Sequence, residues 1–302
     1  MISPAENLLE ILRLERIERN IFRGANEDRM GGRLFGGQVL GQALRAAWNT
    51  VEGRFAHSLH GYFIRPGDSS RPVLYDVERI RDGTSFATRR VVAIQNGAAI
   101  CNLDVSFQVD EEGFSHEDAM PNVPLPEDLE DDVASVRRLA DADPRGHRWA
   151  RRERPFESRS VYGMGRERAS RERFWNPVWL RFKSRVAASD RALSCCLLAY
   201  ASDMGMVSTS ILPHTSVTHA LRFAPGAVAA RQDDTSRARV QMASLDHALW
   251  IHRRFVIDDW LLFVKRSSTA TGSRGMNHAE FFDRSGQLVA SVAQEGLMRM
   301  VE

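Results

Sequence analysis

The feature of this sequence that most constrains its fold is an order of predicted elements that occurs twice. In each half, a strand is followed by a mostly apolar helix and then by a series of strand-like runs. The first half has the strand at 13–24, the helix at 35–51 and the runs at 57–67, 71–81, 85–95 and 98–109. The second half has them at 176–187, 190–205, 238–255, 260–270, 276–284 and 287–300. Asp82-Gly83, Asn96-Gly97 and Ser285-Gly286 are typical of tight turns between antiparallel strands.

This order predicts an α+β fold in which an antiparallel sheet wraps around a helix. A helix that is apolar on every face is what such an enclosed position requires. The arrangement is the hotdog, and two copies in one chain predict a double hotdog, with two antiparallel sheets each wrapped around a central helix. We expect an N-terminal hotdog at 1–116, a charged linker at 117–155 and a C-terminal hotdog at 156–302.

The middle of the chain is strongly charged. Residues 117–143 hold nine carboxylates against two arginines, with Pro121, Pro124 and Pro126 clustered early, which predicts a linker with room for a short solvated helix. Ten arginines follow between 145 and 173. They could form a solvated face that pairs with the acidic linker or with another subunit, or a patch that attracts a phosphorylated ligand.

Composition excludes several classes of protein. No run approaches the roughly 20 apolar residues of a membrane span, and "MISPAENLLE" lacks the apolar core of a secretory signal, so we expect no membrane association and a cytoplasmic location. A net charge of +2 gives no argument for nucleic acid. The three cysteines, Cys101, Cys195 and Cys196, are expected to be reduced and buried, and no zinc spacing occurs, so we predict no metal and no cofactor.

Familiar catalytic motifs are missing. "GTSFA" (83–87) lacks the second glycine of a nucleophile elbow, and "GMGRER" (163–168) has Arg168 where a dinucleotide-binding motif needs its third glycine. No Walker A or H-E-x-x-H sequence is present. The pairs His57/His60 and His247/His252 lie on corresponding strands, and we expect each of these histidines to be hydrogen-bonded or half-exposed rather than a catalytic base.

Three polar residues stand out because the pattern buries them. Asp203 closes the second apolar helix, where the helix dipole disfavours a carboxylate. Gln294 shares strand parity with Ala290 and Val292, and Ser244 shares parity with apolar residues of 238–255. Burying such groups unpaired costs roughly 1–3 kcal/mol each, so they are expected to satisfy one another or a ligand near one helix terminus. A purely structural polar cluster is the alternative.

Six blocks of the sequence closely resemble acyl-CoA thioesterase II, the TesB-like double-hotdog enzymes. In order along both halves they are "FGGQVLGQAL" (35–44), "HSLHGYFIRPGD" (57–68), "YDVERIRDGTSFATRRVVAIQNG" (75–97), "YASDM" (200–204), "SLDHALWIHRRF" (244–255) and "SVAQEGLMR" (291–299). The resemblance implies a catalytic Asp, Thr and Gln around a water. These roles fall on Asp203, Ser244 and Gln294, with serine in place of threonine. It also implies homo-oligomers.

The resemblance further implies hydrolysis of a medium- or long-chain fatty acyl-CoA, with Asp203 as general base for direct attack by water. Donors for the developing oxyanion would be the Gln294 amide or the backbone N–H groups of Gly36-Gly37-Gln38. Two other functions stay open. A hotdog hydratase or dehydratase would use a His–carboxylate pair near His57, and a non-catalytic acyl-CoA-binding protein would release no thiol.

Overall fold

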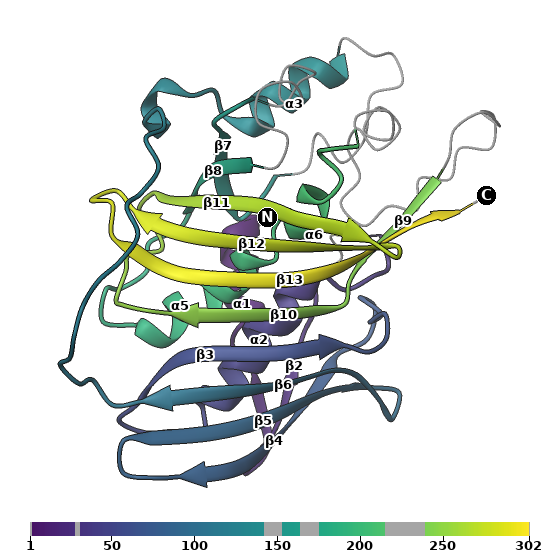
Figure 1. Ribbon diagram of the computed structural model, residues 1–302. Coiled ribbons are helices and arrows are strands. Elements are labelled where there is room, and N and C mark those ends of the chain that lie inside the picture. The colour runs from purple at the N-terminus through teal and green to yellow at the C-terminus, as the bar shows by residue number, and fades with distance from the viewer. Residues whose placement is uncertain (1, 28–30, 142–152, 164–174, 215–238, 302) are drawn as a thin grey trace.

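The structure is a computed structural model that describes residues 2–27, 31–141, 153–163, 175–214 and 239–301 (Figure 1). The first half contains α1 (Pro4–Ile11), β1 (Glu15–Glu18), β2 (Ile21–Gly24), α2 (Gly36–Trp48), β3 (Phe55–Phe63), β4 (Val73–Asp82), β5 (Phe86–Gln95) and β6 (Ala98–Gln108). The middle contains η1 (Pro126–Asp128) and α3 (Asp132–Asp141). The second half contains β7 (Phe156–Ser160), β8 (Trp175–Phe182), α5 (Arg191–Ser202), α6 (Met206–Thr209), β9 (Arg239–Ser244), β10 (Asp246–Ile251), β11 (Leu261–Thr271), β12 (Arg274–Asp283) and β13 (Leu288–Val301).

The two halves share one strand order, which confirms the double hotdog. The first half runs β2-β4-β5-β6-β3 and the second β8-β11-β12-β13-β10, so the strand after each helix pairs with the last strand of its own half. The expected two sheets are one continuous sheet, because β3 and β10 also pair with each other antiparallel, with Leu59 opposite Leu249. Figure 1 shows the strands from β8 to β10 stacked above those from β3 to β4 in this order, with β2, α2 and α5 behind them.

Turn residues fix the meander where the sequence predicted them. Asn96 and Gly97 join β5 to β6 with φ values of 51° and 73°, as a type I′ turn requires, and Gly286 turns between β12 and β13 with φ 88°. The strand expected at 13–24 is instead the hairpin β1–β2, because the chain reverses at Arg19-Asn20. Helix α1, which no pattern predicted, begins with a capping box between Ser3 and Glu6.

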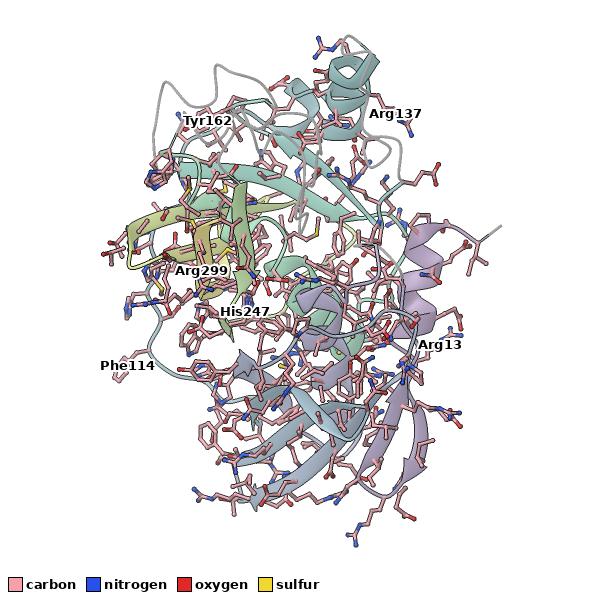
Figure 2. The ribbon with its side chains drawn as sticks, turned by 90° about the vertical axis from the view of Figure 1, so that its right-hand side faces the viewer. Arg13, Phe114, Arg137, Tyr162, His247 and Arg299 are labelled. Carbon is pink, nitrogen blue, oxygen red and sulfur yellow. The ribbon has the colours of Figure 1, made fainter. Side chains whose placement is uncertain are left out.

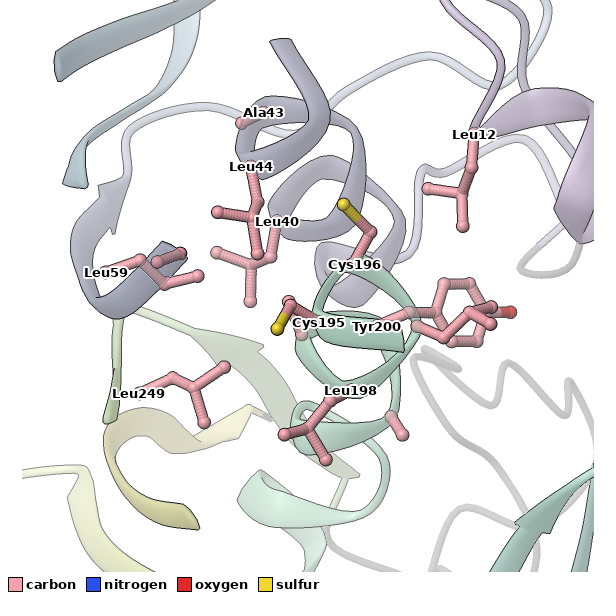
Figure 3. Packing of buried hydrophobic residues seen from close by; sticks show 14 of the residues in the cluster. Leu12, Leu40, Ala43, Leu44, Leu59, Cys195, Cys196, Leu198, Tyr200 and Leu249 are labelled. Atoms are coloured by element: carbon pink, nitrogen blue, oxygen red, sulfur yellow. The ribbon is translucent and has the colours of Figure 1, made fainter. Parts of the chain in front are cut away.

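Helices α2 and α5 pack against each other antiparallel through glycines of α2. A Cβ at Gly37 would collide with the Tyr200 carbonyl, and one at Gly41 would lie 2.9 Å from the Cys196 carbonyl one turn further on. The four-residue spacing puts both glycines on one helix face. In Figure 3, Leu59 and Leu249 project from the sheet toward this helix pair. The core therefore forms around two helices that approach through backbone, and the start of α2 lies beside the end of α5.

The acidic middle segment packs on the outer face of the second half rather than hanging free. The Trp179 indole N–H donates to the Pro124 carbonyl at 2.9 Å, and Asp132 accepts from the backbone and hydroxyl of Ser160. Glu127 pairs with Arg284 at 2.8 Å. The predicted short helix corresponds to α3. The linker and domain bounds at 117 and 155 stay predictions.

Most of the arginine-rich segment, including eight of its ten arginines, lies outside the described residues. Arg159, which is described, pairs with Glu157 and donates to the carbonyls of Pro126 and Leu129. At this position the arginine bonds to backbone carbonyls of the middle segment, and the two interpretations of the arginine-rich segment stay predictions. Within the described part of the chain, no helix is long and apolar enough to cross a membrane.

Candidate active site

Asp203 is the C-terminal cap of α5, with φ −83° and ψ −10°, and the chain then reverses through Gly205 at φ 75°. Asp203 as a whole is only 7% exposed. Because the start of α2 lies beside this terminus, the Gly37 backbone N–H donates to Asp203 Oδ2 at 2.9 Å. The end of α5 disfavours negative charge, but the facing N-terminus of α2 favours it. The glycine contact between the helices is what brings the compensating dipole to Asp203.

The three predicted site residues meet at this point. Gln294 on β13 donates through Nε2 to Asp203 Oδ1 at 3.0 Å and to Ser244 Oγ at 2.7 Å. The Ser244 hydroxyl, at the end of β9, donates to the same Oδ1 at 3.2 Å. Gln294 is fully buried, and Ser244 is half-buried. The hydrogen-bonded cluster that the sequence pattern predicted is present, with an Asp, a hydroxyl and an amide in mutual contact.

The reasoning from strand parity was wrong for Ser244, although its position was right. The stretch 238–255 is not one strand but β9 and β10, with a β-bulge at Leu245. Ser244 is opposite Gly296, whereas Ala248 is opposite Ala293, so β9–β10 carries one more residue than the facing part of β13. The buried face accordingly changes from even-numbered residues to His247, Leu249 and Ile251.

This bulge adds a residue to the site that the sequence reasoning missed. His247 is 1% exposed, and its Nδ1 lies 2.7 Å from Gln294 Oε1 while its Nε2 lies 2.8 Å from the Ser202 hydroxyl. It is hydrogen-bonded, as expected of all four histidines, but it belongs to the cluster. In Figure 2, His247 lies near the middle of the molecule, whereas Phe114 projects away from it. Spacing alone gives no signal for a bulge, so a period of two puts Ser244 and His247 on opposite faces.

Burial raises the pKa of Asp203 to about 6. The hydrogen bonds from Gln294, Ser244 and the Gly37 N–H lower the pKa and so oppose the effect of burial. The carboxylate is therefore mostly ionised near neutral pH yet far more basic than a solvated aspartate. Burial lowers the pKa of His247 to about 4, so this ring is neutral at the same pH.

The other three histidines singled out from the sequence, His57, His60 and His252, contact groups outside this cluster. His57 Nε2 contacts the Ser106 hydroxyl at 2.8 Å, and the His60 ring lies edge-on against Trp250 on the outer face of the sheet. His252 Nε2 contacts the Ser291 hydroxyl at 2.9 Å. Over the described residues, no group of three or more His, Cys, Asp or Glu side chains could hold a metal ion.

Comparison with known proteins matches both halves of the chain. Models of the acyl-CoA thioesterase N-terminal and C-terminal domains match residues 26–108 and 120–298. Acyl-CoA thioesterase 2 of Haemophilus influenzae is 36% identical over 305 residues, with 100% of both chains covered. The chain belongs to the acyl-CoA thioesterase II family. This membership confirms the family predicted from the sequence blocks. This thioesterase is therefore a thioester hydrolase.

Two further relatives agree. Acyl-coenzyme A thioesterase 8 of Mus musculus is 37% identical to this thioesterase over 301 residues, covering 96% of this chain and 88% of the mouse protein. The crystal structure of the acyl-CoA thioesterase II TesB2 of Mycobacterium marinum matches with a TM-score of 0.76 at 36% identity, covering 98% and 99% of the two chains. The double-hotdog fold is therefore shared with solved members of the family.

Proposed function

We propose that this thioesterase hydrolyses medium- and long-chain fatty acyl-CoA to free fatty acid and CoA by direct attack of water. The observation that carries the proposal is a buried carboxylate with a pKa near 6 whose neighbours, Gln294 and Ser244, donate to a single oxygen. Oδ2 accepts from the Gly37 N–H and keeps a second lone pair. A water held there would give its proton to Asp203 as it attacks the thioester carbonyl.

Each polar group has a defined role in this mechanism. Asp203 is the general base, and Ser244 and Gln294 hold its carboxylate in one orientation, so that the water is aligned before the substrate reacts. The leaving thiolate of CoA is stable enough at neutral pH that we assign no general acid. Ser244 supplies the hydroxyl that the family resemblance assigns to threonine.

Hydrogen bonds that are already made reduce the number of candidate donors for the oxyanion. Both N–H groups of the Gln294 amide are used, the Gly37 N–H donates to Asp203, and the Gln38 N–H donates to the Phe35 carbonyl. We therefore assign the Gly36 N–H, in the first turn of α2, to the developing oxyanion. A Cβ at Gly36 would lie 2.7 Å from Asp203 Oδ2 and 2.9 Å from the Phe63 ring, so a side chain there would fill the space beside the carboxylate.

The test is thiol release from acyl-CoA substrates between acetyl and palmitoyl, measured with a chromogenic thiol reagent. We expect the highest kcat/KM from octanoyl to palmitoyl, and a loss of about 10²–10⁴ in kcat for Asp203→Asn with acyl-CoA binding retained. Near wild-type turnover of Asp203→Asn would remove the residue from the mechanism.

The same assay separates the alternatives. A hydratase or dehydratase would change the acyl chain without releasing thiol, and a binding protein would do neither. His57, which the hydratase alternative needs beside a carboxylate, is bonded to the Ser106 hydroxyl. Homo-oligomeric assembly and a cytoplasmic location stay predictions.

A further inference from the structure

His247 has no role in the mechanism above, yet its buried ring contacts the amide oxygen of Gln294. Its ring lies between α5 and β13, with one nitrogen against Ser202 and the other against Gln294. It does not contact Asp203 directly. All three side chains of this row, Ser202, His247 and Gln294, are at most 1% exposed, so water does not compete for their hydrogen bonds.

The chemistry of each group sets the direction of the row. An ionised Asp203 accepts only, so the Gln294 amide must present Nε2 to it and to Ser244. The amide oxygen then faces His247, and the ring must donate Nδ1–H to it at 2.7 Å. A neutral ring has one N–H, so Nε2 accepts from the Ser202 hydroxyl, which could otherwise donate to the Ala199 carbonyl.

The reversed amide would put Gln294 Oε1 against the carboxylate, an acceptor facing an acceptor. With the amide held as observed, two donors act on Asp203 Oδ1 and lower the basicity that burial raises. Among the described residues, charged groups near this end of α5 include Lys265, which donates to the Met204 carbonyl at 3.4 Å, Glu27, which accepts from the Tyr200 hydroxyl, and Asp246, which accepts from the Glu295 N–H. The orientation of one amide therefore decides whether Asp203 has a donor or an acceptor beside it.

We propose that His247, seated by Ser202, is a positioning residue that fixes the Gln294 carboxamide with its two N–H donors toward Asp203 and Ser244. This rests on the proposed function, because it explains how the base is held ready. The bulge at Leu245 is what makes the arrangement possible, since it turns Ser244 and His247, three positions apart, toward the same amide.

The test compares His247→Leu, which removes the donor, with His247→Asn, whose amide nitrogen can replace Nδ1. Asn277→Leu is the matched control. Asn277 is also fully buried and lies opposite Gln294 on β12. It accepts from the Ser210 hydroxyl and donates to the main-chain carbonyls of Gly275 and Gln294, but it does not bond to the Gln294 side chain. Circular dichroism and thermal unfolding establish that each variant is folded at the assay temperature.

For His247→Leu we expect kcat to fall about 10- to 100-fold with KM changed less than about threefold, and the acid midpoint of the kcat–pH profile to move upward. The His247→Asn variant should recover most of kcat and return the midpoint toward wild type. Asn277→Leu should lower the unfolding temperature without moving the midpoint. Wild-type kcat and midpoint in His247→Leu would overturn the proposal, as would equal losses in both His247 variants with an unmoved midpoint.

A measurement independent of hydrolysis separates this proposal from the proposed function. The Asp203 carboxyl can be titrated by ¹³C NMR in protein labelled at aspartate, with Asp203→Asn to assign the signal. We expect its pKa to rise in His247→Leu even if Asp203 proves not to be the base. An unchanged titration would refute the positioning role, whatever the assay shows.

Discussion

At the end of the helix pair where α2 stops and α5 begins, Arg89 and Asp190, which bond to the two helix ends, each lie where the helix dipole favours their charge. Arg89 is 1% exposed, and its guanidinium donates to the carbonyl and the hydroxyl oxygens of Thr50, just past the last turn of α2. Asp190 caps α5 by accepting from the Leu193 N–H. At the opposite end, the C-terminus of α5 carries the buried carboxylate of Asp203, and Lys265 donates to the carbonyl of the next residue, Met204. The same architecture thus gives a stabilising cap at one end and, at the other, a carboxylate that its own helix disfavours and whose pKa is raised by burial.

The candidate site lies at the end of the helix pair where a carboxylate occupies a helix C-terminus. Within the described residues, the N-terminal half bonds to Asp203 through backbone alone, the Gly37 N–H, while the C-terminal half supplies the side chains of the hydrogen-bonded cluster. Sequence repetition of elements therefore does not imply two sites. The predictions below separate stability from activity at the two ends.

The largest expected effect is on stability at the Arg89 end. Arg89→Met removes donors from Thr50, from the carbonyls of Arg81 and Thr88, and from Asp82. We expect the free energy of unfolding to fall by about 2–4 kcal/mol, because buried acceptors lose their partners. The kcat of the folded enzyme should stay within about twofold of wild type. Urea unfolding and thiol release measure the two quantities.

Arg90→Met is the control for this variant. Arg90 is the next residue along β5, half-exposed, and pairs with Glu78 and Asp104 on the surface. Its loss should change stability by less than about 1 kcal/mol. If Arg89→Met instead reduced kcat as strongly as a change at the Asp203 end, the division of roles between the two ends would be wrong.

The second prediction uses two glycines of one interface. Gly37→Ala and Gly41→Ala each push a Cβ into a carbonyl of α5, and we expect each to cost about 1–3 kcal/mol of stability. Gly37 also donates to Asp203, so moving it should lower kcat by about tenfold, whereas Gly41→Ala should leave kcat within about twofold. Equal kcat values for the two variants would show that the position of the α2 terminus does not matter to the site.

Much of this could be predicted from the sequence, for identifiable reasons. Periodicity and turn residues such as Asn96-Gly97 depend on local backbone rules, and they gave the strands and the two helices. Asp203 and Gln294 stood out because each breaks the apolar pattern of its own element. These features depend on each element alone and not on its partners. The predictions based on them were therefore confirmed for the fold and for the contact between these two residues.

What could not be predicted depends on contacts between distant segments. The bulge at Leu245 is a mismatch between two strands, so neither strand shows it alone, and it hid His247. The contact of Gly37 with Tyr200 joins residues more than 160 positions apart. The hydrogen bond from the α2 terminus at Gly37 to Asp203 spans a similar distance along the chain. The pairing of β3 with β10, which joins the two sheets, likewise depends on two distant strands and is not visible in either strand alone.

The smallest expected effect concerns the stability that the buried carboxylate costs. A carboxyl whose folded pKa is about 6, above its value of 3.8 when unfolded, binds its proton more tightly in the folded protein. The protein therefore loses stability as pH rises from about 4 to about 6, by about 3 kcal/mol at most, and regains it on acidification. Asp203→Asn removes this cost but leaves the Gly37 N–H poorly paired, so we expect a net gain of about 1–2 kcal/mol at pH 8 that disappears near pH 4.

Asp190→Asn at the other end of α5 is the matched control for that measurement, since it changes the same charge on the same helix. Because Asp190 sits where the dipole favours a carboxylate, its neutralisation should lower stability by about 0.3–1 kcal/mol at pH 8. Urea unfolding of both variants at pH 4 and pH 8 gives the four differences required. Opposite signs at pH 8 would support the contrast between the two ends. A loss of stability for Asp203→Asn at pH 8 would mean that the hydrogen bonds of the Asp203 carboxylate outweigh the cost of burying its charge. In that case this carboxylate would not destabilise the folded protein.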